Sequence, residues 1–434
     1  MQRYGSWGRY PAATPAAVVP VHWRSDPPAL DRIPGPVLPY ACGRSYGDSC
    51  LNDGGVLLDM RRLDRLIAFD ADGGLLRCEA GVTLAQILAL VVPRGWFLPV
   101  VPGTRWVSVG GAIANDIHGK NHHRSGTFGA HVTSLELLRS DGARIVCTPN
   151  DELFRATVGG LGLTGVILWA EIRLKRIPGP GISMERIRFA GLANFFELTA
   201  DDHRFEYTVA WVDCLARGRR LGRGIYMRGD HAPLDGAVPS PLEPARISIP
   251  LDAPAGLLNG LTLGLFNEAY YRAQLRARRR MTLPYAPFFF PLDVIGAWGR
   301  LYGPKGFVQY QCVVPDTPGG GPIRTILERI SRSGEPASLA VLKRFGSARS
   351  PGLLSFPREG MTLAVDFPVR GAATFALLDD LDAVVRETGG AIYPAKDARM
   401  SAESFRAFFP ALDRFIAQQD SKFSSSFWRR VHAT

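Results

Sequence analysis

The sequence lacks several features that would assign it to a simple class. None of its uncharged apolar runs reaches the roughly 18 residues that a membrane-spanning helix needs. Its six cysteines include no pair with the spacing of a metal or redox motif, so we expect free thiols that pack as small apolar groups. The 47 glycines and 33 prolines follow no period, which excludes a collagen-like chain.

The N-terminus also lacks the pattern of a secretory signal peptide. Pro11, Pro15 and Pro20 interrupt the short apolar part of the N-terminus, where a signal peptide would have a continuous apolar stretch. We therefore expect a protein of the cytoplasm, or one that lies peripherally at the inner membrane. A periplasmic location by another export route stays open.

The signatures of two hydrolase classes do not occur. There is no G-x-S-x-G, so Ser/His/Asp hydrolysis has no support. His118, His122 and His123 lie close together, but no H-E-x-x-H accompanies them. Gly119 weakens a helix at this point and Lys120 would repel a cation, so we predict no metal site.

A nicotinamide-binding Rossmann fold is excluded although residues 160–165 match G-x-G-x-x-G. In that fold the motif follows a strand and opens a helix. Here a helix is predicted before the motif, at 151–158, and a strand after it, at 165–174. The glycines therefore indicate a tight turn, which can still lie near a ligand.

The predicted elements mix short strands with helices, which indicates the α+β class. In the first 180 residues we expect strands at 56–59, 75–79, 106–109, 132–138, 144–147 and 165–174, and helices at 83–92 and 151–158. Beyond them we expect strands at 204–214 and 307–314, a helix at 374–387, and a helical segment at 402–428 that Pro410 interrupts. The stretch 215–291 is basic and rich in proline, so we predict irregular, mobile loops there.

Two glycine-bearing segments predict a bound dinucleotide. Residues 43–48 (GRSYGD) form a loop whose successive N–H groups can hold an anion. About sixty residues later, Gly110 and Gly111 open a small-residue segment that lets the backbone approach a planar ring, and a helix that starts there favours negative charge. One loop on each side of a pyrophosphate leads us to predict FAD, and hence an oxidoreductase. An ordinary turn and close helix–strand packing are the alternatives for the two segments.

The formal net charge of +11 is concentrated in residues 217–223 and 276–280. The second cluster follows an apolar run at 261–266 and precedes the aromatic residues Phe288, Phe289 and Phe290. Basic residues beside exposed aromatics suit an anionic lipid surface or a phosphate-bearing substrate. A solvated basic face is the alternative, and we predict no nucleic-acid partner.

Taken together, the motifs resemble those of the vanillyl-alcohol-oxidase-like flavoproteins, which carry a PCMH-type FAD-binding domain. Within them the chain is similar to the decaprenylphosphoryl-β-D-ribose 2′-oxidase family. The similar motifs run in order along nearly the whole chain: GRSYGD, PGTRWVSVGGAIANDIHGKNHH, GLGLTG, GFVQYQ, LSFP, VDFP and YPAKDAR. The resemblance is weakest over 215–291.

The resemblance implies a two-subdomain FAD-binding domain and a substrate-binding domain with an antiparallel sheet. The glycine- and proline-rich residues 178–181 of this chain are the expected boundary. We therefore expect domains at 1–180 and 181–390, and a C-terminal segment at 391–434 that returns to the FAD domain. The resemblance implies FAD contacts from Cys42, Gly43, Arg44, Ser45, Tyr46, Gly47, Asp48, Gly103, Thr104, Ser108, Val109, Gly110, Gly111, Asn115, Asp116, Ile117, His118, Ile167 and Tyr393. It implies a substrate side formed by Trp211, Gln309, Gln311, Lys343 and Lys396.

Two positions depart from the family pattern. Arg44 stands where some relatives have the histidine that binds FAD covalently, so we predict non-covalent FAD. Ala364 stands where mycobacterial members have a cysteine, so a thiol there cannot be essential, and thiol-trapping inhibitors should fail.

The expected reaction is oxidation of the 2′-hydroxyl of a polyprenyl-phosphoryl-ribose, the first half of an epimerisation to the arabinosyl lipid of the cell envelope. A short-chain NAD(P)-dependent reductase is the implied partner. We expect His118 to be the base or to hydrogen-bond to it, Lys120 to lie near the isoalloxazine, and Lys396 to stabilise reduced flavin or bind the phosphate. A soluble alditol or sugar-lactone oxidase of the same fold is the alternative.

Overall fold

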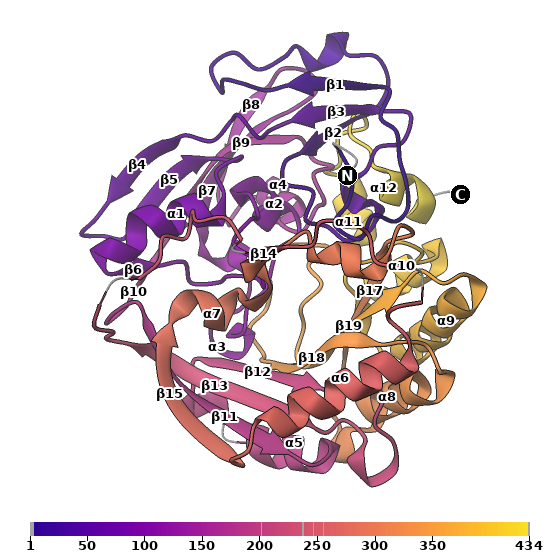
Figure 1. Cartoon of the computed structure of the whole chain (residues 1–434). Helices are drawn as coiled ribbons and strands as arrows, with labels where there is room; N and C mark the ends of the chain where they lie inside the picture. Colours follow the sequence, from indigo (N-terminus) through magenta and orange to yellow (C-terminus); the bar gives the residue numbers. More distant parts are fainter. Residues whose placement is uncertain (1–3, 201, 237, 246, 255, 433–434) are drawn as a thin grey trace.

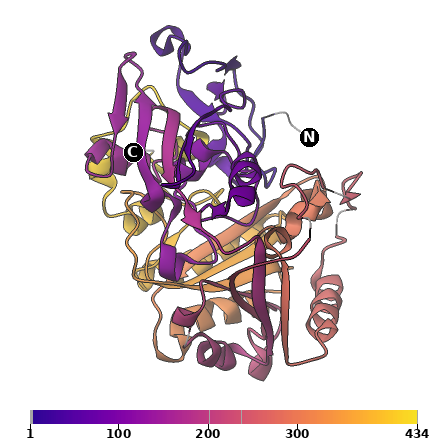
Figure 2. The same ribbon diagram turned by 90° about the vertical axis from the view of Figure 1, so that its left-hand side faces the viewer.

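The computed structural model describes residues 4–200, 202–236, 238–245, 247–254 and 256–432. Figure 1 shows an N-terminal half of small sheets, in indigo and purple, above one large sheet in magenta and orange. Figure 2, from the side, shows the small sheets on one face of the large sheet and helices on its other face. The α+β class is confirmed.

Two sheets make up the N-terminal half. A parallel sheet has the order β1-β3-β2 and an antiparallel sheet has the order β4-β5-β9-β7-β8. Their strands are β1 (Ala17–Pro20), β2 (Val37–Tyr40), β3 (Val56–Asp59), β4 (Leu66–Asp70), β5 (Leu75–Glu79), β7 (Val132–Leu138), β8 (Arg144–Cys147) and β9 (Val166–Arg173). Between them lie helices α1 (Leu84–Val91), α2 (Val109–Ala114), α3 (His122–Ser125) and α4 (Glu152–Thr157). The short strands β6 (Trp96–Phe97) and β10 (Lys175–Arg176) pair with each other.

Local signals predicted several of these elements and failed at one. The helix expected at 83–92 is α1, where the side chains of Thr83 and Gln86 form a reciprocal cap. The strand expected at 106–109 is wrong. Ser108 instead caps α2, and its hydroxyl accepts a hydrogen bond from the N–H of Gly111. The cap turns the chain into a helix directly before the glycine pair.

The large sheet is antiparallel and has the order β15-β11-β13-β12-β18-β19-β17-β20. Its strands are β11 (Gly181–Phe189), β12 (Tyr207–Val212), β13 (Gly224–Ala232), β15 (Arg278–Pro284), β17 (Phe307–Val314), β18 (Ser338–Phe345), β19 (Gly360–Pro368) and β20 (Ala391–Ile392). Helices α5 (Leu192–Thr199), α8 (Gly321–Ser333) and α9 (Ala372–Glu387) share one apolar core with it (Figure 1). The other face of the sheet is thus left for the N-terminal half.

The prediction of irregular loops over 215–291 is wrong. The stretch contains β13, β15, helix α6 (Gly260–Ala273) and helix α7 (Tyr285–Phe289), and the short β14 (Ile247–Ser248) pairs with β16 (Ile295–Gly296). The aromatic residues Phe288, Phe289 and Phe290 are buried, against the expectation of an exposed cluster. Phe289 packs against Phe97 and Tyr207, with ring centroids 5.3 and 4.7 Å away. This region is ordered by contacts with residues that are distant in the sequence. Its composition does not reveal these contacts.

The C-terminal segment carries helices α10 (Ala402–Phe408), α11 (Leu412–Ile416) and α12 (Ser426–Val431); in Figure 1 α12 lies near β2, and α10 lies near α9. Phe423 forms a β-bridge with Val37. Arg430 of α12 forms ion pairs with Asp48, at 2.7 Å, and with Asp397, at 2.9 Å. The end of the chain therefore supports the loop at 43–48. The domain limits themselves stay a prediction.

Candidate active site

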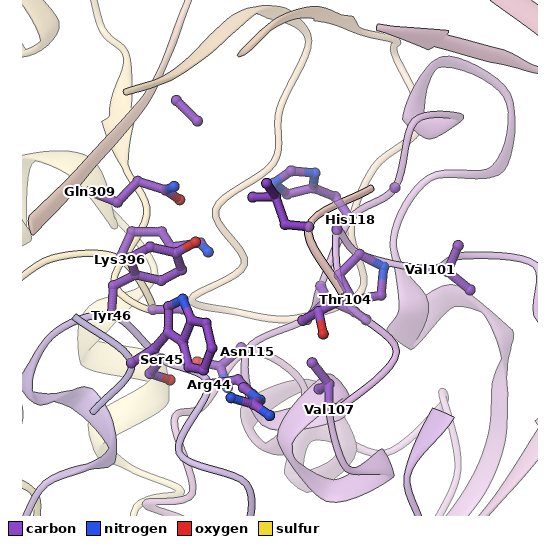
Figure 3. A pocket seen from close by; sticks show the side chains of 18 of the residues that line it. Arg44, Ser45, Tyr46, Val101, Thr104, Val107, Asn115, His118, Gln309 and Lys396 are labelled. Atoms are coloured by element: carbon purple, nitrogen blue, oxygen red, sulfur yellow. The ribbon is translucent and has the colours of Figure 1, made fainter. Parts of the chain in front are cut away.

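A cavity of about 810 Å³ lies between the N-terminal loops and the inner face of the large sheet. Figure 3 shows Tyr46, Gln309 and Lys396 on one side of it and His118 on the other, with Arg44 at its base. Its volume is within the range of sites for large organic ligands. The cavity therefore joins the two glycine-bearing segments to the strands that the sequence placed on the substrate side.

Most of the residues predicted to form the site line this cavity. They are Cys42, Gly43, Arg44, Ser45, Tyr46, Gly103, Thr104, Ser108, Gly110, Gly111, Asn115, Ile117, His118, Lys120, Ile167, Trp211, Gln309, Gln311, Lys343, Tyr393 and Lys396. Gly47, Asp48, Val109 and Asp116 are outside the lining and support it from behind. Asp48 is paired with Arg430, and the carboxylate of Asp116 accepts hydrogen bonds from Gly129 and Ser355. Gly47 packs so closely that an added Cβ would lie 1.7 Å from the carbonyl oxygen of Asp397.

The loop at 43–48 has the chemistry of an anion site. Gly43 has φ +56°, a left-handed conformation that favours glycine. Among the residues described, none accepts a hydrogen bond from the N–H groups of Gly43 and Arg44. The guanidinium of Arg44 lies 4.3 Å from the ring centroid of Trp7, and its Nε donates to the carbonyl of Trp106 at 3.2 Å. Two free amides beside a held cation fit a phosphate group.

The glycine pair plays a different part from the one that the sequence suggested. The N–H groups of Val109 and Gly110 donate to the carbonyls of Val82 and Ala80, so the start of α2 has few free donors. An added Cβ on Gly110 would lie 3.1 Å from the Cβ of Ala80. Close packing, the alternative interpretation, therefore holds at Gly110. Both glycines still border the cavity, where they leave room for a flat ligand.

His118 is partly buried in the wall of the cavity. Its Nε2 lies 2.8 Å from the side-chain amide of Gln311, and its Nδ1 lies 3.3 Å from Nζ of Lys343. Burial, reinforced by the charge of Lys343, holds the pKa of His118 well below its usual range. The imidazole is therefore neutral at neutral pH, with both ring nitrogens beside polar partners.

Three partly buried lysines of the cavity lining lie near His118. Burial lowers the pKa of Lys120 to about 8. Burial lowers the pKa of Lys343 to about 7, with the charges of Lys120 and Lys396 adding to the effect. Nζ of Lys120 donates to the carbonyl of Phe289 at 3.1 Å, and Nζ of Lys396 lies 3.7 Å from the ring centroid of Tyr46. Together they create a site that favours an anion.

Sequence reasoning missed Asp366, a buried carboxylate on β19 that also lines the cavity. It accepts hydrogen bonds from Gln309, at 2.5 Å, and from the hydroxyl of Tyr302, at 3.1 Å. Burial raises the pKa of Asp366 and lowers the pKa of Lys396, while their mutual attraction opposes both shifts. The signal was present in VDFP, the segment from Val365 to Pro368, but no role was assigned to its acid.

The other end of the cavity is apolar. Met184, Met227, Met281 and Leu283 of strands β11, β13 and β15 line it, together with Trp211 of β12. Methionine side chains adapt to irregular apolar ligands. The cavity thus offers cations at one end and a hydrocarbon-like wall at the other.

These features fit FAD: free amides and Arg44 for a phosphate, and glycines where a flat ring system can lie. Residues 32–148 match the family described as the FAD binding domain. The protein is an FAD-dependent oxidoreductase.

A second comparison covers almost the whole chain. Over 456 residues the chain is 38% identical to the decaprenylphosphoryl-beta-D-ribose oxidase of Mycolicibacterium smegmatis, and the match covers 99% of this chain and 97% of that protein. The chain belongs to the family of this oxidase.

Two other relatives match over shorter stretches. The Delta(24)-sterol reductase of Homo sapiens is 35% identical over 26% of this chain and 23% of its own length. A putative D-arabinono-1,4-lactone oxidase of Neurospora crassa is 32% identical over 32% of this chain and 24% of its own length.

Proposed function

We propose that the protein oxidises the 2′-hydroxyl of a polyprenyl-phosphoryl-β-D-ribose to the 2′-keto sugar. The observation that carries the proposal is the two-ended cavity, with Lys120, Lys343 and Lys396 at one end and methionines at the other. A sugar phosphate suits the cationic end, and a prenyl chain suits the apolar end. The relative from Mycolicibacterium smegmatis, whose name specifies such a lipid, supports this choice.

Bound FAD supplies the acceptor for the hydride that leaves C2′. We propose that the residues named above as lining the cavity hold it, with the free amides of Gly43 and Arg44 toward a phosphate group. A non-covalent complex follows, because Arg44 offers no nucleophile at the position where some relatives carry a histidine.

The hydroxyl proton must leave as the hydride does. His118 is the proposed acceptor because burial keeps its imidazole neutral. Lys343, 3.3 Å from Nδ1, positions the ring and discourages a lasting positive charge on it. Gln311, on β17, lies 2.8 Å from Nε2, so the substrate hydroxyl would displace this amide in order to give its proton to that nitrogen.

The lysines have the second task, which is to bind negative charge. Lys343 faces His118, so it is suited to the phosphate next to the reacting carbon. Lys396 is held over Tyr46 and is balanced by Asp366, so it is suited to charge that develops on the cofactor side.

The remaining partners are proposals on the family likeness. A short-chain NAD(P)-dependent reductase would complete the epimerisation to the arabinosyl lipid used in the cell envelope. A lipid substrate requires access to a membrane surface, so we propose a peripheral protein that acts at the inner membrane. In the part of the chain that the structure describes, no helix is long and apolar enough to cross a bilayer.

Anaerobic bleaching of the yellow protein tests this function. We expect a prenyl-phosphoryl-ribose in detergent to remove the visible absorbance, and ribose 5-phosphate or free alditols to leave it in place. The lactone-oxidase relative makes a soluble alditol or sugar lactone the second candidate. Bleaching by these small molecules, with none by the lipid, would overturn the proposal in favour of that candidate.

A further inference from the structure

Helix α6 presents an apolar surface to solvent. Leu261, Leu265 and Phe266 are 73, 64 and 54% exposed, and Leu275 just beyond the helix is 87% exposed. Leu261 and Leu265 are four residues apart and so share one side of the helix. In Figure 2 this helix, in salmon, stands at the edge of the molecule.

The exposure does not arise from a loosely held helix. The helix is held in place by Asn267, which donates to Asp213 at 2.8 Å, and by Glu268, which pairs with Arg223 at 2.6 Å. Asn259 caps its start. A rigid helix that keeps large apolar groups in solvent is typical of a docking element.

Beside α6 lies a pocket of about 440 Å³ lined by Arg186, Arg276 and Arg279. Arg186 and Arg279 are directly opposite each other on the neighbouring strands β11 and β15, where like charges destabilise the sheet. Nε of Arg186, a donor, is buried without a hydrogen-bond partner. Among the described residues, no carboxylate pairs with these three arginines. The arrangement favours an anion from outside.

The pocket adjoins the opening of the large cavity. Arg186 and Tyr270 line both, and Phe266, which is more than half exposed, also lines the cavity. The rings of Phe266 and Tyr270 are stacked with their centroids 6.0 Å apart. The apolar end of the cavity thus reaches the surface between the exposed helix and the arginines.

We propose that α6 and the arginine pocket dock the protein on a bilayer that contains anionic phospholipids. Leu261, Leu265 and Phe266 enter the interfacial region, and a phospholipid phosphate occupies the pocket. The substrate would then pass from the bilayer into the apolar end of the cavity. The passage of a lipid substrate rests on the proposed function, whereas the docking on a bilayer does not.

The substrate's own phosphate is a poorer occupant of the pocket. In the proposed substrate it is bonded to the carbon next to the reacting one, so it must lie with the sugar, near the lysines. Arg186 of the arginine pocket is on β11, which is separated from β18, the strand of Lys343, by β13 and β12. A different anion therefore suits the pocket, and the headgroups of anionic phospholipids supply one.

Vesicle co-sedimentation of the FAD-loaded protein tests the proposal. We expect binding to phosphatidylglycerol-containing vesicles that weakens with salt, and little binding to phosphatidylcholine alone. R276Q/R279Q should bind the anionic vesicles about 30-fold more weakly. R62Q/R173Q removes two exposed arginines of the N-terminal half and so makes the same change of charge; it should bind as the unaltered protein does.

The apolar contribution is tested separately with L261S/L265S, which should lose vesicle binding while keeping the visible absorbance of bound FAD. Equal binding by the unaltered protein, R276Q/R279Q and L261S/L265S would overturn the proposal, as would equal loss in R62Q/R173Q. Direct binding of inorganic phosphate at millimolar concentration, with no vesicle binding, would reveal a site for free phosphate and would overturn it too. Bleaching by substrate in detergent should be unchanged in all variants, so failure of that assay would count against the proposed function and leave the docking result intact.

Discussion

Burial in the cavity wall lowers the pKa values of Lys343 and Lys120 to about 7 and about 8, because it disfavours the charged form of each amine. A bound phosphate favours their charged forms. As pH rises through these values the free enzyme loses the protons that the phosphate needs. We expect the KM for the prenyl-phosphoryl-ribose to rise between about pH 7 and 9. Lys343→Arg keeps its charge over this range and should flatten the rise. A KM independent of pH in the unaltered protein would contradict a phosphate role for these amines.

Lys396 permits a test of the cofactor side. Replacing it by Ala removes the cation that faces Asp366 and Tyr46, so we expect turnover to fall by about 100-fold. Visible absorbance should show that FAD is retained, because the loop at 43–48 is untouched. Lys305→Ala, an exposed lysine, is the matched control and should be normal. Normal turnover in Lys396→Ala would remove this residue from the reacting site.

Ala364 gives a third test at this scale. It lines the cavity on β19, opposite Gln311 of β17. The unaltered protein should form no adduct with thiol-trapping inhibitors in intact-mass measurements, because burial also raises the pKa values of the cavity cysteines Cys42 and Cys50. Ala364→Cys should acquire one adduct. An adduct on the unaltered chain would contradict this alignment of β19.

Residue types and motifs predicted most of the cavity wall. Glycines, a lysine and histidines in one short stretch indicate a ligand site more than they indicate a structural element. They did not predict Asp366 or the methionines. A buried acid is recognisable only from its neighbours, here Gln309 on the adjacent strand and Tyr302. Methionines are common in any core, so they carry no signal until a sheet brings them to one wall.

At the scale of elements, Gly47 joins the loop at 43–48 to the C-terminal segment. A Cβ there would collide with the carbonyl of Asp397, which belongs to backbone and cannot easily move. We expect Gly47→Ala to lower the thermal midpoint and to release FAD on gel filtration. Gly260→Ala, at the start of α6 with nothing within 4 Å, should behave as the unaltered protein. Retained FAD and stability in Gly47→Ala would show that this junction is more adaptable than its packing indicates.

Elements were predictable where local chemistry decides them. The hairpin over 132–147 follows from alternating apolar residues around a turn, and α1 follows from its reciprocal cap. The stretch 215–291 was not predictable, because β13 and β15 exist by pairing on either side of β11. The residues within each strand do not indicate which distant strand it will pair with.

At the scale of the whole molecule, Arg430 connects the last helix to the first loops. It neutralises Asp48 and Asp397, which are nearly inaccessible to solvent. Arg430→Met would leave both carboxylates unpaired and should cost about 3 kcal/mol of unfolding free energy. Arg406→Met breaks only an exposed pair with Asp413 and should cost less than about 1 kcal/mol. Denaturant titration of both variants measures the difference, and equal costs would contradict the role given to Arg430.

The bridge between Val37 and Phe423 has a consequence for biosynthesis. The loop at 43–48 is synthesised early, yet Asp397 and Arg430, which support it, are synthesised much later. A nascent chain paused before residue 420 would have the strands of the nucleotide-binding half but not the contacts that hold them against that loop. We therefore expect FAD to be captured only after Phe423 and Arg430 have reached these contacts.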